Sequence, residues 1–355
     1  MEEKDLKSVG IPDPQDAPLA ARQHGSSAEA IVEYLFADWP ALDSSIEAGG
    51  ALSDEEERAI AKIVDSFLKA QYEETSVEAE RCMNSRHPEI SHFALLAHAF
   101  ANVALNKIEV ARKDLRALQA KEQNPENQHN AALNDIYRFV LSAFFHLGDK
   151  TTSVPMELFS HCSEGARLFM LYAQSYALYL QQEYGQALGV AEAALVMAAD
   201  RHLILRIYLN LVASMAAINL SRFELSDRFF LKALELAKPD GYIQPFIGHH
   251  GPLQGLVEKH IREHEPELYL FIAEKVTRFR RGWTEIHNPL SYGKVTNLLT
   301  PYEFSLAMMA AKGKTNQEIA DNLNISINTV KAYLSMIFQK IGITKRSELA
   351  EYLNK

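Results

Sequence analysis

Residues 300 to 354 contain two helix-start signals whose spacing leaves few possible folds. Thr300-Pro301-Tyr302-Glu303 and Thr315-Asn316-Gln317-Glu318 both match the Thr-x-x-Glu capping box, in which each side chain satisfies an otherwise unpaired backbone amide at a helix start. The first box also has proline at the first helical position, where its missing N–H costs nothing. The sequence therefore predicts helices that begin near Pro301 and near Asn316.

A third helix is predicted after a short break. Asn324-Ile325-Ser326 interrupts the second helix, and Ser326 is placed to cap the next one, which is the spacing of a helix-turn-helix. Gly342 then ends the third helix, and a fourth is predicted from about Lys345 to Leu353. One apolar stripe along the third helix must pack on the two preceding helices, and it comprises Ile327, Val330, Leu334, Ile337, Phe338 and Ile341.

The opposite side of the third helix has short, mostly polar side chains. A projection at about 3.6 residues per turn places Lys331 and Lys340 at its edges. Such a face suits the DNA major groove, which admits one helix and presents base edges to it. We expect Asn328 to pair with adenine, the Ala332 methyl to meet a thymine methyl, and the lysines to reach guanine or phosphate. The face itself comprises Asn328, Thr329, Ala332, Ser335, Met336 and Gln339.

These motifs together resemble the LuxR/GerE-type four-helix DNA-binding domain. The resemblance rests on Leu299-Thr300-Pro301-x-Glu303, Gly313-x-Thr315-Asn316-x-Glu318-Ile319-Ala320, Leu323, Ile325-Ser326, Thr329-Val330-Lys331 and Lys340-Ile341-Gly342. It implies that the third helix enters the major groove and that the fourth pairs two copies into a homodimer on a two-fold site of double-stranded DNA. The contacts that the resemblance implies are Thr329, Lys331, Ala332 and Ser335 on bases and phosphates, with Thr315 and Asn316 near the backbone.

The sequence departs from that family at four positions. Tyr302 and Phe304 stand where the family usually has arginines, Tyr333 replaces a frequent histidine, and Ser335 replaces a basic side chain in many relatives. Residues 301–355 carry seven Lys/Arg against five Asp/Glu, so +2, which leaves −12 for the remainder of a chain of net charge −10. Because an acidic surface repels phosphate, we expect any contact with nucleic acid to be confined to this C-terminal part.

Length and composition indicate a soluble protein of two or three domains. The chain has 355 residues, of which 47% are apolar, and its most apolar run, Leu203 to Leu220, contains Arg206 and Asn210 and is typical of a buried helix and not of a membrane span. Cys82 and Cys162 lie in no metal or redox spacing, and no signal peptide is recognised. We therefore expect a cytoplasmic protein, with residues 1–27, rich in Pro, Asp, Gln and Ser, as a disordered tail.

The segment 28–285 has helical periodicity throughout and a self-similarity of 39 residues. Tyr184-Gly185-Gln186-Ala187 corresponds to Phe223-Glu224-Leu225-Ser226, and weaker copies lie at Ile108 to Leu118 and Tyr72 to Cys82. The pattern resembles tetratricopeptide-type (TPR) helical hairpins in the looser form found in MalT-like regulators, as does the segment Asp240 to Leu256. The predicted fold is therefore all-α: a TPR-like superhelix with a concave binding surface in 28–285, a linker in 286–298, and a LuxR-type helix-turn-helix domain in 299–355.

Several enzymatic interpretations are disfavoured. Gly313-Lys314-Thr315 lacks the first glycine of a P-loop, and the α/β pattern of a phosphoacceptor domain is missing, so we expect no ATPase domain and no cofactor. His260-Ile261-Arg262-Glu263-His264 matches the order of inverted zinc proteases, but we interpret it as an exposed helix end that Pro266 terminates. We expect no enzymatic activity, and metal analysis of the purified protein would test whether His260, Glu263 and His264 bind zinc.

The function predicted from the sequence is that of a sequence-specific bacterial transcription regulator. The helical repeat would sense a small molecule or a protein partner, and RNA polymerase is the expected partner at promoters. The predicted DNA contacts are Thr315, Asn316, Asn328, Thr329, Lys331, Ala332, Ser335, Gln339 and Lys340. The alternative is a TPR-type adaptor that sequesters another regulator without touching DNA, and a zinc hydrolase is a more distant third.

Overall fold

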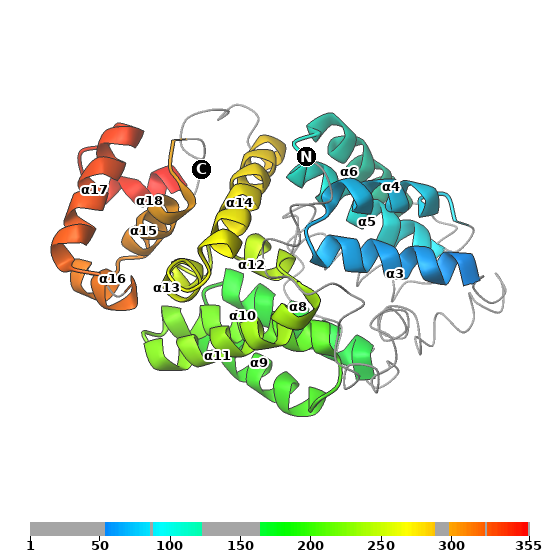
Figure 1. Ribbon diagram of the computed structural model, residues 1–355, viewed down its shortest axis with the longest axis horizontal. Helices are drawn as coiled ribbons and strands as arrows, with labels where there is room; N and C mark the ends of the chain where they lie inside the picture. The colour runs from blue at the N-terminus through cyan, green and yellow to red at the C-terminus, as the bar shows by residue number, and fades with distance from the viewer. Residues whose placement is uncertain (1–53, 86–87, 123–163, 288–297, 324, 354–355) are drawn as a thin grey trace.

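The computed structural model describes residues 54–85, 88–122, 164–287, 298–323 and 325–353, and all regular secondary structure within these ranges is helical. The tail predicted at 1–27 and residues 288–297 of the predicted linker lie outside the described residues. The helices are α3 (Asp54–Leu68), α4 (Tyr72–Cys82), α5 (Pro88–Ala104), α6 (Ile108–Glu122), α8 (Glu164–Leu180), α9 (Tyr184–Ala198), α10 (Leu203–Asn219), α11 (Phe223–Ala237), α12 (Gln244–Gly248), α13 (Leu256–His260), α14 (Pro266–His287), α15 (Pro301–Ala311), α16 (Asn316–Leu323), α17 (Ile327–Ile341) and α18 (Glu348–Leu353), with a 3-10 turn at Lys238–Asp240. We refer to α3–α14 as the helical body and to α15–α18 as the C-terminal domain (Figure 1).

The helical body is built from antiparallel helix hairpins that repeat. The hairpin α10–α11 follows α8–α9 at an offset of 39 residues in both of its helices, as the helix ends at Leu180 and Asn219 and the helix starts at Tyr184 and Phe223 show. The weaker copies predicted at Tyr72 and Ile108 are likewise the first residues of α4 and α6. The predicted 39-residue periodicity is therefore confirmed as a periodicity of helix hairpins.

Each of the hairpins α3–α4, α5–α6, α8–α9 and α10–α11 turns through a residue in the left-handed conformation, two positions before its second helix. The residues are Ala70 (φ 57°), Asn106 (φ 59°), Gln182 (φ 67°) and Ser221 (φ 59°). The amide after each one bonds to the carbonyl five residues earlier, as in Arg222 N to Ala217 O at 2.9 Å, which is the 6→1 bond of a Schellman motif. Because none of the four is glycine, sequence analysis did not recognise this turn.

The hairpins pack closely because one position in each second helix carries a small side chain. Thr75, Ala111, Ala187 and Ser226 lie three residues after the helix start, and all four are fully buried. The small side chain leaves room for a hydroxyl group of the first helix to reach the backbone of the second, as where Ser175 Oγ donates to the carbonyl of Ala187 at 2.7 Å. These small residues thus let the paired helices approach each other closely.

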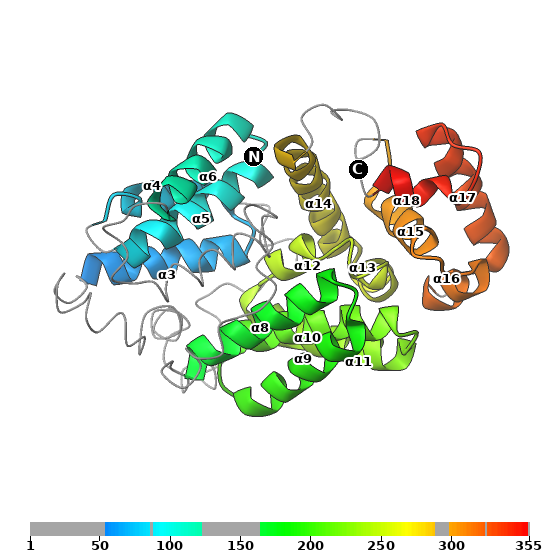
Figure 2. The same ribbon diagram turned by 180° about the vertical axis from the view of Figure 1, so that it is seen from behind.

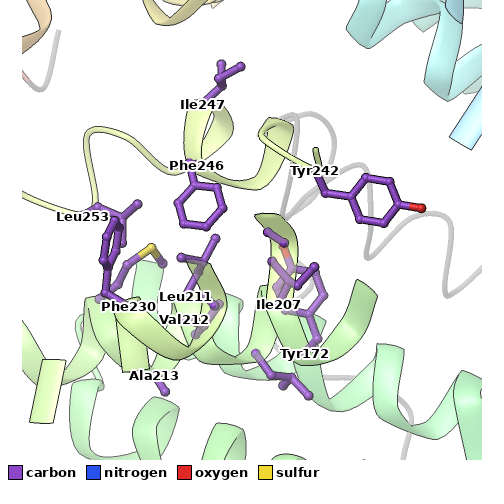
Figure 3. Packing of buried hydrophobic residues seen from close by; sticks show 14 of the residues in the cluster. Tyr172, Ile207, Leu211, Val212, Ala213, Phe230, Tyr242, Phe246, Ile247 and Leu253 are labelled. Carbon is purple, nitrogen blue, oxygen red and sulfur yellow. The ribbon is translucent and has the colours of Figure 1, made fainter. Parts of the chain in front are cut away.

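A continuous core joins α8–α11 to the short helix α12 above them. Figure 3 shows Phe246 of α12 pointing toward Leu211 of α10, while Ile247 points to the opposite side of α12. The rings of Phe230 and Phe246 meet edge to face at 5.6 Å between centroids, a favourable aromatic geometry.

His249 and His250 lie just after α12 and are buried in this region. His249 Nδ1 lies 2.8 Å from the carbonyl oxygen of Pro245. Its ring also lies edge-on to Tyr176 and Tyr208, and burial lowers its pKa from 6.5 to about 4. His249 is therefore a neutral core residue at neutral pH.

The long helix α14 connects the parts of the molecule. It lies between the N-terminal helices and the C-terminal domain in both views (Figures 1 and 2), and it contacts α5, α6, α12 and α15. At Gly282 it approaches α5 so closely that a Cβ would lie 2.0 Å from the carbonyl oxygen of Val103. The prediction that Pro266 ends a helix is wrong, because Pro266 is the first residue of α14, a position where its missing N–H is not needed.

Candidate nucleic-acid interface

The two capping boxes predicted from the sequence are both present and fix the starts of α15 and α16. Glu303 N donates to Thr300 Oγ1 at 3.3 Å, and Thr300 N donates to Glu303 Oε2 at 2.9 Å. The equivalent distances in the Thr315 box are 3.1 Å and 2.6 Å. The predicted starts near Pro301 and Asn316 are confirmed, because capping depends on residues only three positions apart.

Helix α17 begins and ends where the sequence predicts. The Ser326 side chain accepts from Thr329 N at 3.0 Å, and Gly342 adopts the left-handed conformation with φ 72°. The apolar stripe is turned toward α15 and α16: Val330, Leu334, Ile337 and Ile341 are buried, while Ile327 and Phe338 are half-buried at its margins. The opposite side of α17 is therefore left free of the domain core.

That opposite side is exposed to solvent. Helix α17 lies at the outer edge of the molecule in both views, with the rest of the C-terminal domain between it and the helical body (Figures 1 and 2). Thr329 is half-buried, since its hydroxyl lies 2.7 Å from that of Ser326. The other predicted contacts on this side are exposed, namely Asn328, Lys331, Ala332, Ser335, Gln339 and Lys340.

Three of the predicted contact residues also have partners within the C-terminal domain. Lys340 Nζ lies 2.6 Å from a carboxylate oxygen of Glu303, which ties the end of α17 to the start of α15. Burial alone would raise the pKa of Glu303, but hydrogen bonds from Lys340 and Thr300 hold it below its usual value. Arg346 NH1 donates to the Asn316 side chain at 2.8 Å, and Thr315 is exposed with its hydroxyl capping α16. Lys331 is thus the predicted cation with no such tie among the residues described.

The fourth helix is shorter than predicted. It begins at Glu348 instead of about Lys345, and residues 344–347 form turns. The physical reason is Arg346, whose guanidinium bonds to the Ala310 carbonyl at 3.2 Å and to the Lys314 carbonyl, so that this segment spans the turn between α15 and α16. Sequence analysis missed this role of Arg346 because the partners are more than 30 residues away.

The aromatic residues that replace the usual arginines of α15 contact arginines of the helical body. The Arg262 guanidinium lies 4.8 Å from the ring centroid of Tyr302, and that of Arg280 lies 4.3 Å from the centroid of Phe304. Arg280 also donates to the Leu299 carbonyl at 2.9 Å, and burial lowers its pKa to about 10. These cation–π contacts attach the C-terminal domain to α14 and to the loop before it.

A second contact joins α16 to the loop before α13. Asn322 is buried, and its amide donates to the Gln254 carbonyl at 3.0 Å. Next to it, Gly255 has φ 91°, and a Cβ there would lie 2.3 Å from Leu323 Cδ2. The C-terminal domain therefore packs on the helical body through α15 and α16, on the side away from the exposed face of α17.

The residues of the zinc-protease pattern do not converge. Helix α13 ends at His260, and residues 261–264 form a turn in which Glu263 and His264 are exposed, so the two histidines do not lie one helical turn apart. His260 Nε2 instead lies 2.7 Å from Asp227 Oδ1 and its ring stacks on Phe230. Nowhere in the described part of the chain do three or more His, Cys, Asp or Glu side chains cluster closely enough to hold a metal ion.

None of the helices described is long and apolar enough to cross a membrane.

Comparison with known proteins identifies the C-terminal part only. Residues 297–353 match the model of the family described as bacterial regulatory proteins, luxR family, so α15–α18 form a LuxR-family helix-turn-helix domain.

Two curated proteins are each similar to a part of this chain. The transcriptional regulatory protein LiaR of Bacillus subtilis is 37% identical over 91 residues, which cover 26% of this chain and 40% of LiaR. The oxygen regulatory protein NreC of Staphylococcus aureus is 38% identical over 58 residues, which cover 16% of this chain and 27% of NreC. The chain thus matches less than half the length of either relative, and no solved structure matches it significantly.

Proposed function

We propose that this chain, whose residues 297–353 form a LuxR-family domain, is a transcription regulator that binds double-stranded DNA through the exposed side of α17. One observation carries the proposal: the side of α17 with Asn328, Lys331, Ala332 and Ser335 is exposed while the apolar side is buried. Short polar side chains let the helix approach base edges closely, and Lys331 supplies a positive charge at the rim of the contact. The relatives LiaR and NreC are themselves named as regulatory proteins, which supports this reading.

The proposed complex contains two copies of the chain on a two-fold site, with RNA polymerase as the partner at the promoter. Each half-site would add its own contacts to α17, so pairing would set the affinity. Thr315 and Asn316, at the start of α16, would lie near the phosphate backbone, as the first helix of a helix-turn-helix does.

The helical body is the proposed sensor. The hairpin α10–α11 borders an open surface hollow of about 730 Å3 along α11, lined by both charged and apolar side chains, among them Asp227, Lys232 and Leu231. Mixed lining of this kind suits a peptide or a small charged molecule, because polar groups orient a ligand while apolar ones remove surface from water. We propose that such an effector changes how the helical body holds the C-terminal domain.

A gel-shift experiment tests the DNA-binding part. The full chain is mixed with fragments of its own promoter region and with duplexes selected from a randomised pool, and Lys331→Glu is compared with Lys113→Glu. Lys113 is a matched control, since it is exposed on α6 of the helical body and does not line the hollow along α11. We expect the wild type and the control to shift the same duplexes and Lys331→Glu to lose binding. Retention of no duplex by the wild type would contradict the proposal and favour an adaptor that acts without DNA contact.

A further inference from the structure

Two lysines of the C-terminal domain are inserted into the helical body. Lys312 and Lys314 lie on either side of Gly313 in the turn between α15 and α16. Lys312 Nζ donates to Tyr179 Oη at 2.9 Å and to Asn219 Oδ1 at 3.2 Å. Lys314 Nζ donates to the Ile218 carbonyl at 2.9 Å and to Ser221 Oγ at 3.0 Å.

The partners of both ammonium groups are neutral. Besides hydroxyl, amide and carbonyl oxygens, they lie over aromatic rings: Lys312 at 5.1 Å from the Tyr179 centroid and Lys314 at 4.9 Å from that of Phe223. Among the described residues neither forms an ion pair with a carboxylate. Burial lowers the pKa of both, that of Lys312 to about 8, with a further contribution from the neighbouring Lys314 charge. Two like charges are thus held in a partly desolvated site where every hydrogen-bond acceptor is neutral, and the nearby Glu318 carboxylate only partly offsets the effect of burial on the Lys314 pKa.

The same two lysines lie next to the start of α16, the first helix of the helix-turn-helix. They immediately precede Thr315, which caps α16, and the first helix of a helix-turn-helix crosses the nucleic-acid backbone. The positive end of the α16 dipole also favours negative charge there, and the Glu318 carboxylate of the capping box already lies at this helix end. Of the seven cations in residues 301–355, Lys340 pairs with Glu303 and Arg346 ties two turns together, so Lys312 and Lys314 make up much of the remaining charge.

We propose that Lys312 and Lys314 are DNA-phosphate contacts that the helical body withholds, so that the hydroxyls and carbonyls of α8 and of the α10–α11 turn compete with phosphate for the same two ammonium groups. The inference rests on the proposed DNA binding and adds two contact residues and a competing surface to it. An ammonium group that exchanges neutral oxygens for a phosphate gains an oppositely charged partner, which favours the DNA-bound arrangement. Release from the body and binding to DNA are therefore coupled through two side chains.

The test uses the opposite signs that the two sides of these bonds predict. In the full chain, Tyr179→Phe with Ser221→Ala removes two acceptors from the body and leaves the C-terminal domain unchanged. Affinity for a duplex that the wild type selects from a randomised pool should then rise by about tenfold, the order of factor that loss of one or two ordinary hydrogen bonds produces. Lys312→Gln with Lys314→Gln removes the same bonds from the other side, but affinity should fall because the phosphate contacts are also lost.

The salt dependence provides a second readout that mere loosening of the body would not change. For Lys312→Gln with Lys314→Gln, the slope of log affinity against log salt should become shallower by roughly 1.8, at about 0.9 for each phosphate contact. The pair Lys312→Arg with Lys314→Arg keeps both charges and should keep the slope, and Lys113→Gln controls for a charge lost elsewhere.

Three results would overturn the inference. They are an unchanged slope in the glutamine pair, an increase in affinity for that pair as for the body-side variant, and an unchanged affinity for a folded body-side variant. Failure of the wild type to retain any duplex from the pool would overturn the proposed function itself, and this inference with it.

Discussion

Replacement of Gly282 by alanine should break the contact between α14 and α5. A Cβ at this position would lie 2.0 Å from the Val103 carbonyl oxygen and 2.9 Å from its carbonyl carbon, whereas an ordinary carbon–oxygen contact is about 3.3 Å. The two helices must therefore separate by roughly 1 Å, since a backbone carbonyl cannot rotate away as a flexible side chain does. Overpacking of this kind costs about 3 kcal/mol, and the better helix propensity of alanine returns about 1 kcal/mol.

The net loss is thus roughly 2 kcal/mol, which urea unfolding monitored by circular dichroism can measure. Gly189→Ala in α9 is a matched control, because a Cβ there meets nothing within 4 Å. That substitution should stabilise the chain by up to about 1 kcal/mol through helix propensity alone. The two substitutions should therefore shift the unfolding midpoint in opposite directions. If Gly282→Ala stabilises the chain as Gly189→Ala does, the inference that α14 and α5 are in backbone contact is refuted.

Three further perturbations follow from single contacts. The pKa of His249 falls from 6.5 to about 4 on folding, so the folded chain binds fewer protons than the unfolded chain. The stability from this group is therefore full above pH 6.5 and should fall by roughly 3 kcal/mol as the pH drops toward 4. Urea unfolding at pH 7.5 and pH 5 should reveal the loss, and His249→Phe should make the stability less dependent on pH. Gly255→Ala should loosen the contact of α16 with the helical body, because its φ of 91° is strained for alanine and its Cβ would meet Leu323 at 2.3 Å; faster amide exchange in α16 would register this, and unchanged exchange would count against it. Ser326→Ala should cost about 1 kcal/mol by removing the cap of α17, whereas Ser335→Ala, at an exposed position, should leave thermal unfolding nearly unchanged.

The sequence by itself determined the features that depend on near neighbours. The starts of α15, α16 and α17 and the end of α17 at Gly342 could be predicted, because a cap joins groups within a few positions. The buried and exposed sides of α17 could be predicted as well, since helical periodicity alone assigns them. The starts of the repeated second helices, such as Tyr184 and Phe223, were visible as a 39-residue periodicity.

Only the tertiary structure decided which residues that lie far apart in the chain contact each other. Tyr302 and Phe304 were noticed as unusual, but their contacts with Arg262 and Arg280 come from another part of the fold. The same holds for Lys312 and Lys314, whose acceptors lie more than 90 residues away. The sequence gives the net charge of residues 301–355, +2, but it does not show which acceptor groups bind the lysines of this segment. The physical reason is that capping and periodicity act along one helix, whereas ammonium and guanidinium groups find their acceptors only once helices from separate segments have packed together.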